Sequence, residues 1–151
     1  MKAILASIHT ARGRAKSSAA EELFQDYATR IARYMSLETQ RFTSEEEMFG
    51  WIAKQTARAP LYIVLLDSRG VQLDSGEFAE RIRNLQDRGT QQVLFAIGPA
   101  DGWSPAAGAR ASWTVSLGPM TLPHELARVV LAEQIYRSCT ILAGHPYHCG
   151  H

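Results

Sequence analysis

The sequence has no long hydrophobic run, few cysteines and almost no net charge, and each of these absences excludes a class of protein. No apolar stretch approaches the ~20 residues that a membrane-spanning helix requires. Two cysteines, Cys139 and Cys149, are too few for a disulfide scaffold and suit a reducing compartment. Because Met1 and Lys2 lead directly into an apolar segment, without a signal-peptide pattern, we expect a cytoplasmic protein.

The net charge of +1 argues against a protein that binds nucleic acid over most of its surface. Such proteins are usually strongly basic, because neutralising phosphates supplies much of the affinity. A local exception is the basic run of Arg12, Arg14 and Lys16, which precedes the first acidic residue, Glu21. A solvated loop explains such a run, and so does contact with RNA phosphates. The three side chains are therefore candidate RNA-binding residues.

Apolar segments with the pattern of strands recur along the whole chain. The segment 61–66 is continuously apolar up to Asp67, which is typical of a central parallel strand. The segment 37–42 is weaker and fits an edge strand equally well. The predicted strands are residues 2–8, 37–42, 61–66, 92–97 and 113–117.

Helical patterns fill the spaces between these strands. Ser18 with Glu21, and Ser44 with Glu47, have the spacing of capping boxes, and Ser75 begins a third helical pattern. The first helix is predicted over 19–34. Because strands and helices alternate without a repeat or linker, we predict one α/β domain over 1–151, a largely parallel sheet flanked by helices.

The longest predicted helix, 123–142, is apolar over more of its circumference than a single stripe. A helix with two buried faces explains this pattern, either in the core of one chain or between two chains of a dimer. The apolar residues are Leu126, Val129, Val130, Leu131, Ile135, Ile141 and Leu142.

Ligands of open parallel sheets bind beyond the carboxyl ends of the strands. Leu66, Gly98 and the loop 117–122 all fall at such ends. Gly98 has no Cβ and so lets a ligand approach the backbone closely. The chain contains no Gly-x-Gly-x-x-Gly motif, which disfavours dinucleotide binding. We therefore expect a small-ligand site of another kind at this edge of the sheet.

The last third of the chain carries motifs that resemble a known family. They resemble those of bacterial methyltransferases that modify N3 of a pseudouridine in large-subunit ribosomal RNA, members of the knotted SPOUT superfamily. Length, opening strand and element order agree with this family over nearly the whole chain. The motif residues are Met120-Thr121-Leu122-Pro123-His124-Glu125-Leu126, Glu133, Tyr136-Arg137 and His145-Pro146-Tyr147-His148.

The resemblance implies a C-terminal trefoil knot, a homodimer with active sites at its interface, and S-adenosylmethionine as the methyl donor. It also implies ribosomal RNA or an assembled ribosome as the partner. The family usually has two consecutive glycines after the strand that ends at residue 97. The second of these positions is Pro99 here, which has no amide N–H to donate. The donor-binding residues implied are Leu66, Gly98, Leu117, Gly118, Pro119, Met120, Thr121 and Leu122.

The His-rich tail supplies the candidate catalytic residues, Tyr147 and His148. Removing the N3 proton of a uracil-type base suits His148, whose ordinary pKa of ~6.5 lies near working pH. Tyr147 is suited to proton transfer or to stacking on a flipped base. Without the motif, a frayed polar terminus would explain these residues. The family usually has Arg or Lys after the second His of this motif, and this chain has Cys149 at that position.

Two further assignments concern the tail and the long helix. His145, His148, Cys149 and His151 form a cluster of metal-ligand types, although we expect no metal because such sites usually draw on several segments. Glu133 and Arg137 are spaced for an ion pair, and Arg137 is also a candidate RNA contact.

The predicted function is methylation of N3 of a pseudouridine in 23S ribosomal RNA. One alternative keeps the donor but changes the acceptor to a transfer RNA base or ribose. Another is a non-catalytic, ribosome-associated RNA-binding factor, for which Pro99 and Cys149 would be the traces of lost function. Affinity for the donor separates this last possibility from the others.

Overall fold

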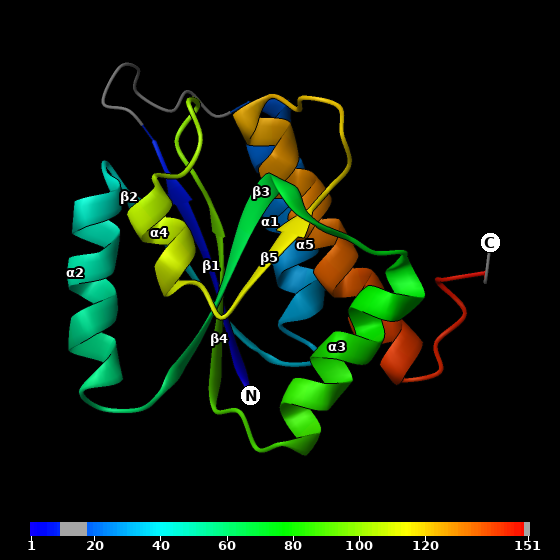
Figure 1. The fold of residues 1–151 in the computed structure, drawn as a ribbon. Helices are drawn as coiled ribbons and strands as arrows, with labels where there is room; N and C mark the ends of the chain where they lie inside the picture. Colours follow the sequence, from blue (N-terminus) through cyan, green and yellow to red (C-terminus); the bar gives the residue numbers. More distant parts are fainter. Residues whose placement is uncertain (10–17, 150–151) are drawn as a thin grey trace.

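The computed structural model describes residues 1–9 and 18–149, which form a five-stranded sheet with helices on both faces (Figure 1). All of the strand pairings are parallel, and the strand order is β2-β1-β4-β3-β5. The strands are β1 (Lys2–Ile8), β2 (Ser36–Phe42), β3 (Leu61–Gln72), β4 (Gln92–Ile97) and β5 (Trp113–Ser116). The predicted fold class is confirmed, and 37–42 is indeed an edge strand.

Two hydrophobic clusters form the core, one on each face of the sheet. The helices α1, α3 and α5 cover one face, and the shorter pair α2 and α4 covers the other (Figure 1). Successive residues of β1 alternate between these clusters: Ala3 and Leu5 face the first, Ile4 and Ala6 the second. Burial on both faces explains why this strand reads as a continuous apolar run. The helices are α1 (Ala19–Ile31), α2 (Glu45–Thr56), α3 (Ser75–Asp87), α4 (Pro105–Arg110) and α5 (His124–Leu142).

Ser18 and Ser44 cap α1 and α2 as the sequence predicted, but neither closes a reciprocal capping box. Ser18 Oγ accepts from the Glu21 amide at 3.1 Å, but the Glu21 carboxylate turns away to two arginines and does not close the box. The reciprocal box forms at α3 instead, between Asp74 and Glu77. At its other end α1 stops at Ile31, earlier than predicted, because the chain turns there to enter β2.

β3 is longer than its apolar run predicts, and Asp67 does not end it. An irregularity between Leu66 and Val71 lets the strand resume its pairing with β5 as far as Gln72. A Cβ on Gly70 would lie 2.8 Å from backbone atoms of β5, so the close approach of the two strands requires glycine. Periodicity did not predict this extension because its residues are largely polar.

The helix α5 lies between α1 and α3 and also rests on the sheet (Figure 1). These contacts within one chain account for its wide apolar surface, so the pattern is no independent sign of a dimer. Leu126 remains 48% exposed near its first turn. No helix in the described ranges has the length and apolarity needed to cross a membrane.

Candidate active site

A cleft of about 680 Å³ opens at the carboxyl ends of β4 and β5, beside the irregular middle part of β3. Its walls come from the loops that follow β4 and β5, from residues 66–69 within β3 and from the first turn of α5. All of the predicted donor-binding residues line it except Pro119, which is exposed within the same loop. The lining residues among them are Leu66, Gly98, Leu117, Gly118, Met120, Thr121 and Leu122.

The loop after β5 is shaped by its first residues. Gly118 has φ of 125°, a conformation that side chains rarely adopt. Its amide donates to Ser116 Oγ at 3.0 Å, and the Ser116 hydroxyl lies 3.0 Å from the Gly118 carbonyl oxygen, to which it donates. Beyond this turn Met120 is 82% exposed and Leu122 37% exposed. The loop therefore presents apolar side chains at the mouth of the cleft.

Trp103 forms part of the cleft wall, and sequence reasoning missed it. Its indole Nε1–H donates to the Leu66 carbonyl oxygen at 2.8 Å, and the side chain is almost fully buried. A Cβ on Gly98 would lie 2.7 Å from Trp103 Cε2. Gly98 is therefore required first for the indole to pack, whereas the sequence suggested that a ligand needed the space. The only sequence signal was a large aromatic residue directly after a glycine turn.

The loop between β4 and α4 is held on both sides. The Gly102 amide donates to the Pro99 carbonyl oxygen at 2.9 Å and closes a turn. Ser104 then donates from its amide and its hydroxyl to the Glu45 carboxylate, at 2.7 and 2.6 Å. Because α2 and β3 both anchor this loop, its wall of the cleft is formed before a ligand arrives. Pro99 is accommodated as the acceptor in the turn.

Two acidic residues, Asp67 and Asp101, line the cleft. Asp67 accepts hydrogen bonds from the Arg69 side chain and, at 2.9 Å, from the Arg69 backbone amide. These bonds lower the pKa of Asp67 and keep it ionised. Asp101 is exposed and forms no ion pair with a described residue. Asp101 therefore gives this part of the cleft a negative charge that a ligand can meet.

Tyr147 and His148 pack back against the second half of α5, where they join a polar cluster. The Tyr147 hydroxyl donates to Glu133 Oε1 at 3.0 Å, and its ring packs edge-on against Tyr136 with centroids 4.7 Å apart. Arg137 donates to Glu133 at 2.5 Å and to His148 Nδ1 at 3.2 Å. The predicted ion pair is confirmed, and Tyr147 is half-buried, which a frayed terminus would not be.

These contacts assign different proton states to the two tail residues. Burial, followed by hydrogen bonds with Tyr27 and Glu133, raises the pKa of Tyr147, so its hydroxyl stays protonated and acts as a donor. An arginine can only donate, so His148 Nδ1 is the acceptor and Nε2 carries the proton of the neutral ring. Hence His148 must release Arg137 before Nδ1 can take another proton.

The other predicted residues are less informative. Arg12, Arg14, Lys16 and His151 lie outside the described residues. In the described tail the candidate metal ligands do not converge: His145 Nδ1 accepts from the Tyr147 amide, and the Cys149 thiol faces the Pro146 carbonyl. Another group, from His9, His124 and Glu125, does converge within the described ranges.

The cleft and the tail cluster are far apart within one chain. Ala127 lines the cleft, whereas Glu133 and Arg137, the helix partners of the tail residues, lie ~9 and ~15 Å further along the helix axis at ~1.5 Å per residue. Figure 1 shows the C-terminal segment leaving from the end of α5 remote from the loop after β5. A single chain therefore does not bring Tyr147 and His148 to its own cleft.

A parallel α/β sheet with a cleft beyond its strand ends places this protein among enzymes that bind a small ligand there. The chain matches the family described as "Predicted SPOUT methyltransferase" over residues 6–148. It therefore belongs to the SPOUT methyltransferase family.

Relatives of known name agree with this membership. The chain is 46% identical, over 92% of its length and 94% of the relative's, to ribosomal RNA large subunit methyltransferase H of Koribacter versatilis. It is 49% identical to the protein of that name from Rhizobium meliloti, over 70% of this chain and 66% of the relative.

Solved structures show the same fold at low identity. The SpoU methyltransferase AviRb of Streptomyces viridochromogenes, in complex with AdoMet, superposes with a TM-score of 0.51 at 16% identity. The match covers 94% of this chain and 60% of that one. A probable methylase family protein from Haemophilus influenzae gives a TM-score of 0.55 at 10% identity, over 95% of this chain and 66% of that one. The chain thus spans less than two thirds of these structures.

Proposed function

We propose that the protein transfers a methyl group from S-adenosylmethionine to N3 of a pseudouridine in large-subunit ribosomal RNA. The observation that carries the proposal is the cleft at the strand ends, lined by the residues that the family resemblance implies for the donor. Family membership and the names of the relatives support the same activity. We further propose that 1–151 is one domain, knotted at its C-terminal end, and that it works in the cytoplasm.

The cleft fits such a donor in size and in chemistry. Its volume of about 680 Å³ is within the range of small-ligand sites. Met120 and Leu122 offer apolar surface for the adenine, and the backbone of Leu117 to Leu122 offers polar groups for its ring nitrogens. Asp101 supplies negative charge near a cationic ligand. Bound there, S-adenosylmethionine supplies an activated methyl group, so the protein's task is alignment and proton management.

The tail supplies the proton chemistry in this proposal. Nδ1 of His148 first loses its hydrogen bond from Arg137 and then accepts the N3 proton of the acceptor base. Arg137 keeps its bond to Glu133, and the N–H group that it releases from His148 can contact the RNA. Tyr147 stays protonated and orients Glu133 through its hydroxyl. Its ring contributes to the surface on which the base rests.

A homodimer would solve the separation between the cleft and the tail. The tail of one subunit would reach the cleft of its partner, because the two sites of a single chain are ~9–15 Å apart along α5. Apolar residues are exposed near the cleft end of the helices, among them Leu23, Met120 and Leu126. Their exposure supports a surface that a partner subunit covers. The basic run Arg12, Arg14 and Lys16 is proposed as an RNA contact.

Mass spectrometry of ribosomal RNA from a deletion strain tests the reaction. We expect one methylated pseudouridine to lose its methyl group, and the purified protein to restore it on ribosomes from that strain. Unchanged ribosomal RNA together with undermethylated transfer RNA would move the acceptor to the alternative substrate. A folded protein without affinity for S-adenosylmethionine would indicate the non-catalytic RNA-binding factor.

Mixed dimers test the shared site. A cleft variant, Trp103→Ala, and a tail variant, His148→Ala, should each be inactive alone. Refolded together, they should regain activity, because a heterodimer contains one cleft and one tail that are both intact. Failure of two folded variants to complement, with the dimer present, would place both halves of the site in the same chain.

A further inference from the structure

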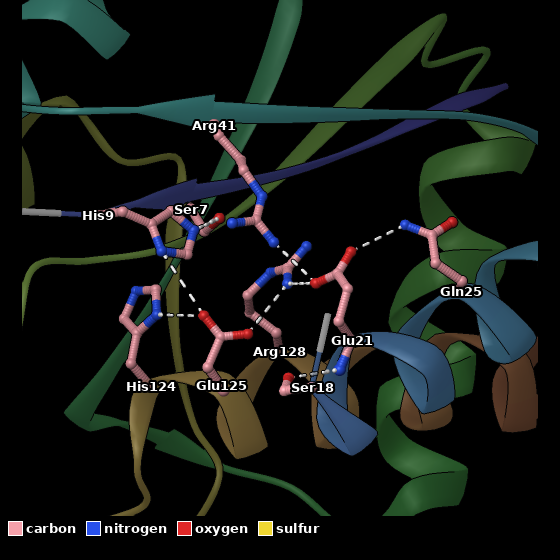
Figure 2. Close-up of polar contacts among 9 residues, drawn as sticks. All are labelled: Ser7, His9, Ser18, Glu21, Gln25, Arg41, His124, Glu125 and Arg128. Atoms are coloured by element: carbon pink, nitrogen blue, oxygen red, sulfur yellow. Dashed lines mark hydrogen bonds and ion pairs between the residues drawn. The ribbon is translucent and has the colours of Figure 1, made fainter. Parts of the chain in front are cut away.

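Three side chains from two distant segments converge beside the donor cleft (Figure 2). His9 follows β1, while His124 and Glu125 begin α5. Glu125 Oε1 lies 3.6 Å from His9 Nδ1 and 4.0 Å from His124 Nδ1. The three ligand atoms all lie within 4.8 Å of one another. Both distances to Oε1 are too long for hydrogen bonds, so the atoms face a common point without binding one another.

These separations are close to those around a bound metal ion. Ligand atoms at ~2.0–2.2 Å from zinc in a tetrahedron lie ~3.3 Å apart, so small side-chain movements would bring the three atoms into place. A second interaction already orients His9, whose Nε2 lies 2.7 Å from Ser7 Oγ. An imidazole that ligates a metal through one nitrogen is normally held in this way through the other.

The charges around the three ligand atoms balance as a group. Glu21 accepts from both Arg41 and Arg128 at 2.7 Å, so its single negative charge offsets one of the two positive charges. Glu125 meets Arg128 through Oε2 at 3.4 Å and leaves Oε1 directed at the imidazoles (Figure 2). Two guanidinium groups and two carboxylates balance, so the ligand set does not carry a net positive charge.

From this geometry we propose that His9, His124 and Glu125 form a binding site for a first-row divalent cation, with Zn²⁺ the best match to two imidazoles and one carboxylate. A fourth position is left for water or a ligand. Since His124 also lines the donor cleft, the ion would join the end of β1 to the start of α5 and stabilise that wall. The site is independent of the methyl-transfer proposal.

Calorimetric titration of Zn²⁺ into the untagged, chelator-treated protein tests the site, with Co²⁺ absorption to report the ligand geometry. We expect one ion per chain and a visible Co²⁺ spectrum of a four- or five-coordinate nitrogen and oxygen site. His9→Ala and Glu125→Gln should each weaken Zn²⁺ binding at least ~10-fold. Removing even a hydrogen-bond partner of a metal ligand typically lowers metal affinity by that factor. Circular dichroism would verify that both variants are folded.

The matched control removes the competing ligands of the tail. A His145→Ala, Cys149→Ser double variant should bind zinc like the wild type. Binding that survives His9→Ala but is lost in the double variant would place the ion at the tail and overturn the proposal. A folded wild-type protein that binds no Zn²⁺ at micromolar concentration would overturn it as well.

Discussion

The two halves of α5 carry sites of opposite construction. At its first turn the cleft is made of strand-end loops, anchored by Trp103 on Leu66 and by Ser104 on Glu45. From its middle onwards the tail cluster is made of side chains, linked through the carboxylate of Glu133. Loops suit a ligand that is held largely through shape and backbone groups, whereas titratable side chains suit proton transfer. The difference implies that donor affinity and transfer rate respond to different residues.

The largest effect is expected at the tail. His148→Ala should lower the transfer rate by ~10²–10⁴-fold, the usual contribution of a general base, while leaving affinity for S-adenosylmethionine unchanged. Methylation of ribosomes from a deletion strain measures the first quantity, and calorimetry the second. Cys149→Ser is the matched control: its thiol is exposed, and its nearest partner is a carbonyl 3.9 Å away, so the rate should hold. A normal rate in His148→Ala would remove the histidine from the mechanism.

The opposite response is expected in the cleft wall. Trp103→Ala should lower the free energy of unfolding by ~3–5 kcal/mol, as for other buried aromatic residues, and weaken donor binding as the loop collapses. Trp103→Phe keeps most of the ring but loses the bond to the Leu66 carbonyl, so its cost should be near ~1 kcal/mol. Urea unfolding and calorimetry measure both. Donor affinity that is unaffected in a folded Trp103→Ala protein would separate the indole from the binding site.

A smaller effect is expected where β1 meets α5. Burial, with smaller effects of Arg41, His124 and Arg128, lowers the pKa of His9 from 6.5 to about 4, against an opposing effect of Glu125. Between these two pH values the unfolded chain binds a proton that the folded chain does not. Stability should therefore fall as pH falls from 6.5 towards 4.

Thermal unfolding over this pH range, with a chelator present, checks the effect in the wild type and in His9→Asn. The variant has no imidazole to protonate at this position, so part of the loss of stability with falling pH should disappear. Parallel curves for the two proteins would show that His9 does not contribute to the pH dependence.

How far the sequence predicted these sites depends on how local their signals are. Gly98 and the loop after β5 were found because strand ends are visible as ends of apolar runs, and parallel strands bring their ends together. Trp103 was missed because its role depends on β3, which is distant in sequence. The His9 group was missed for the same reason, since it joins residue 9 to residues 124 and 125. The burial of Tyr147 required knowing that the chain turns back along α5.

The smallest effect should come from Tyr147→Phe, and it separates packing from chemistry at the tail. The substitution keeps the ring against Tyr136 but removes the hydroxyl that donates to Glu133. Glu133 still accepts from Arg137, so its charge remains paired and the cost should be ~1 kcal/mol of unfolding free energy. The transfer rate should fall only slightly, because a hydroxyl whose pKa is raised by burial is not the group that takes the proton. Single-turnover methylation across a pH series checks this: the variant should keep the wild-type pH profile. A loss as large as that of His148→Ala, or a change in the shape of the profile, would make Tyr147 a proton-transfer residue.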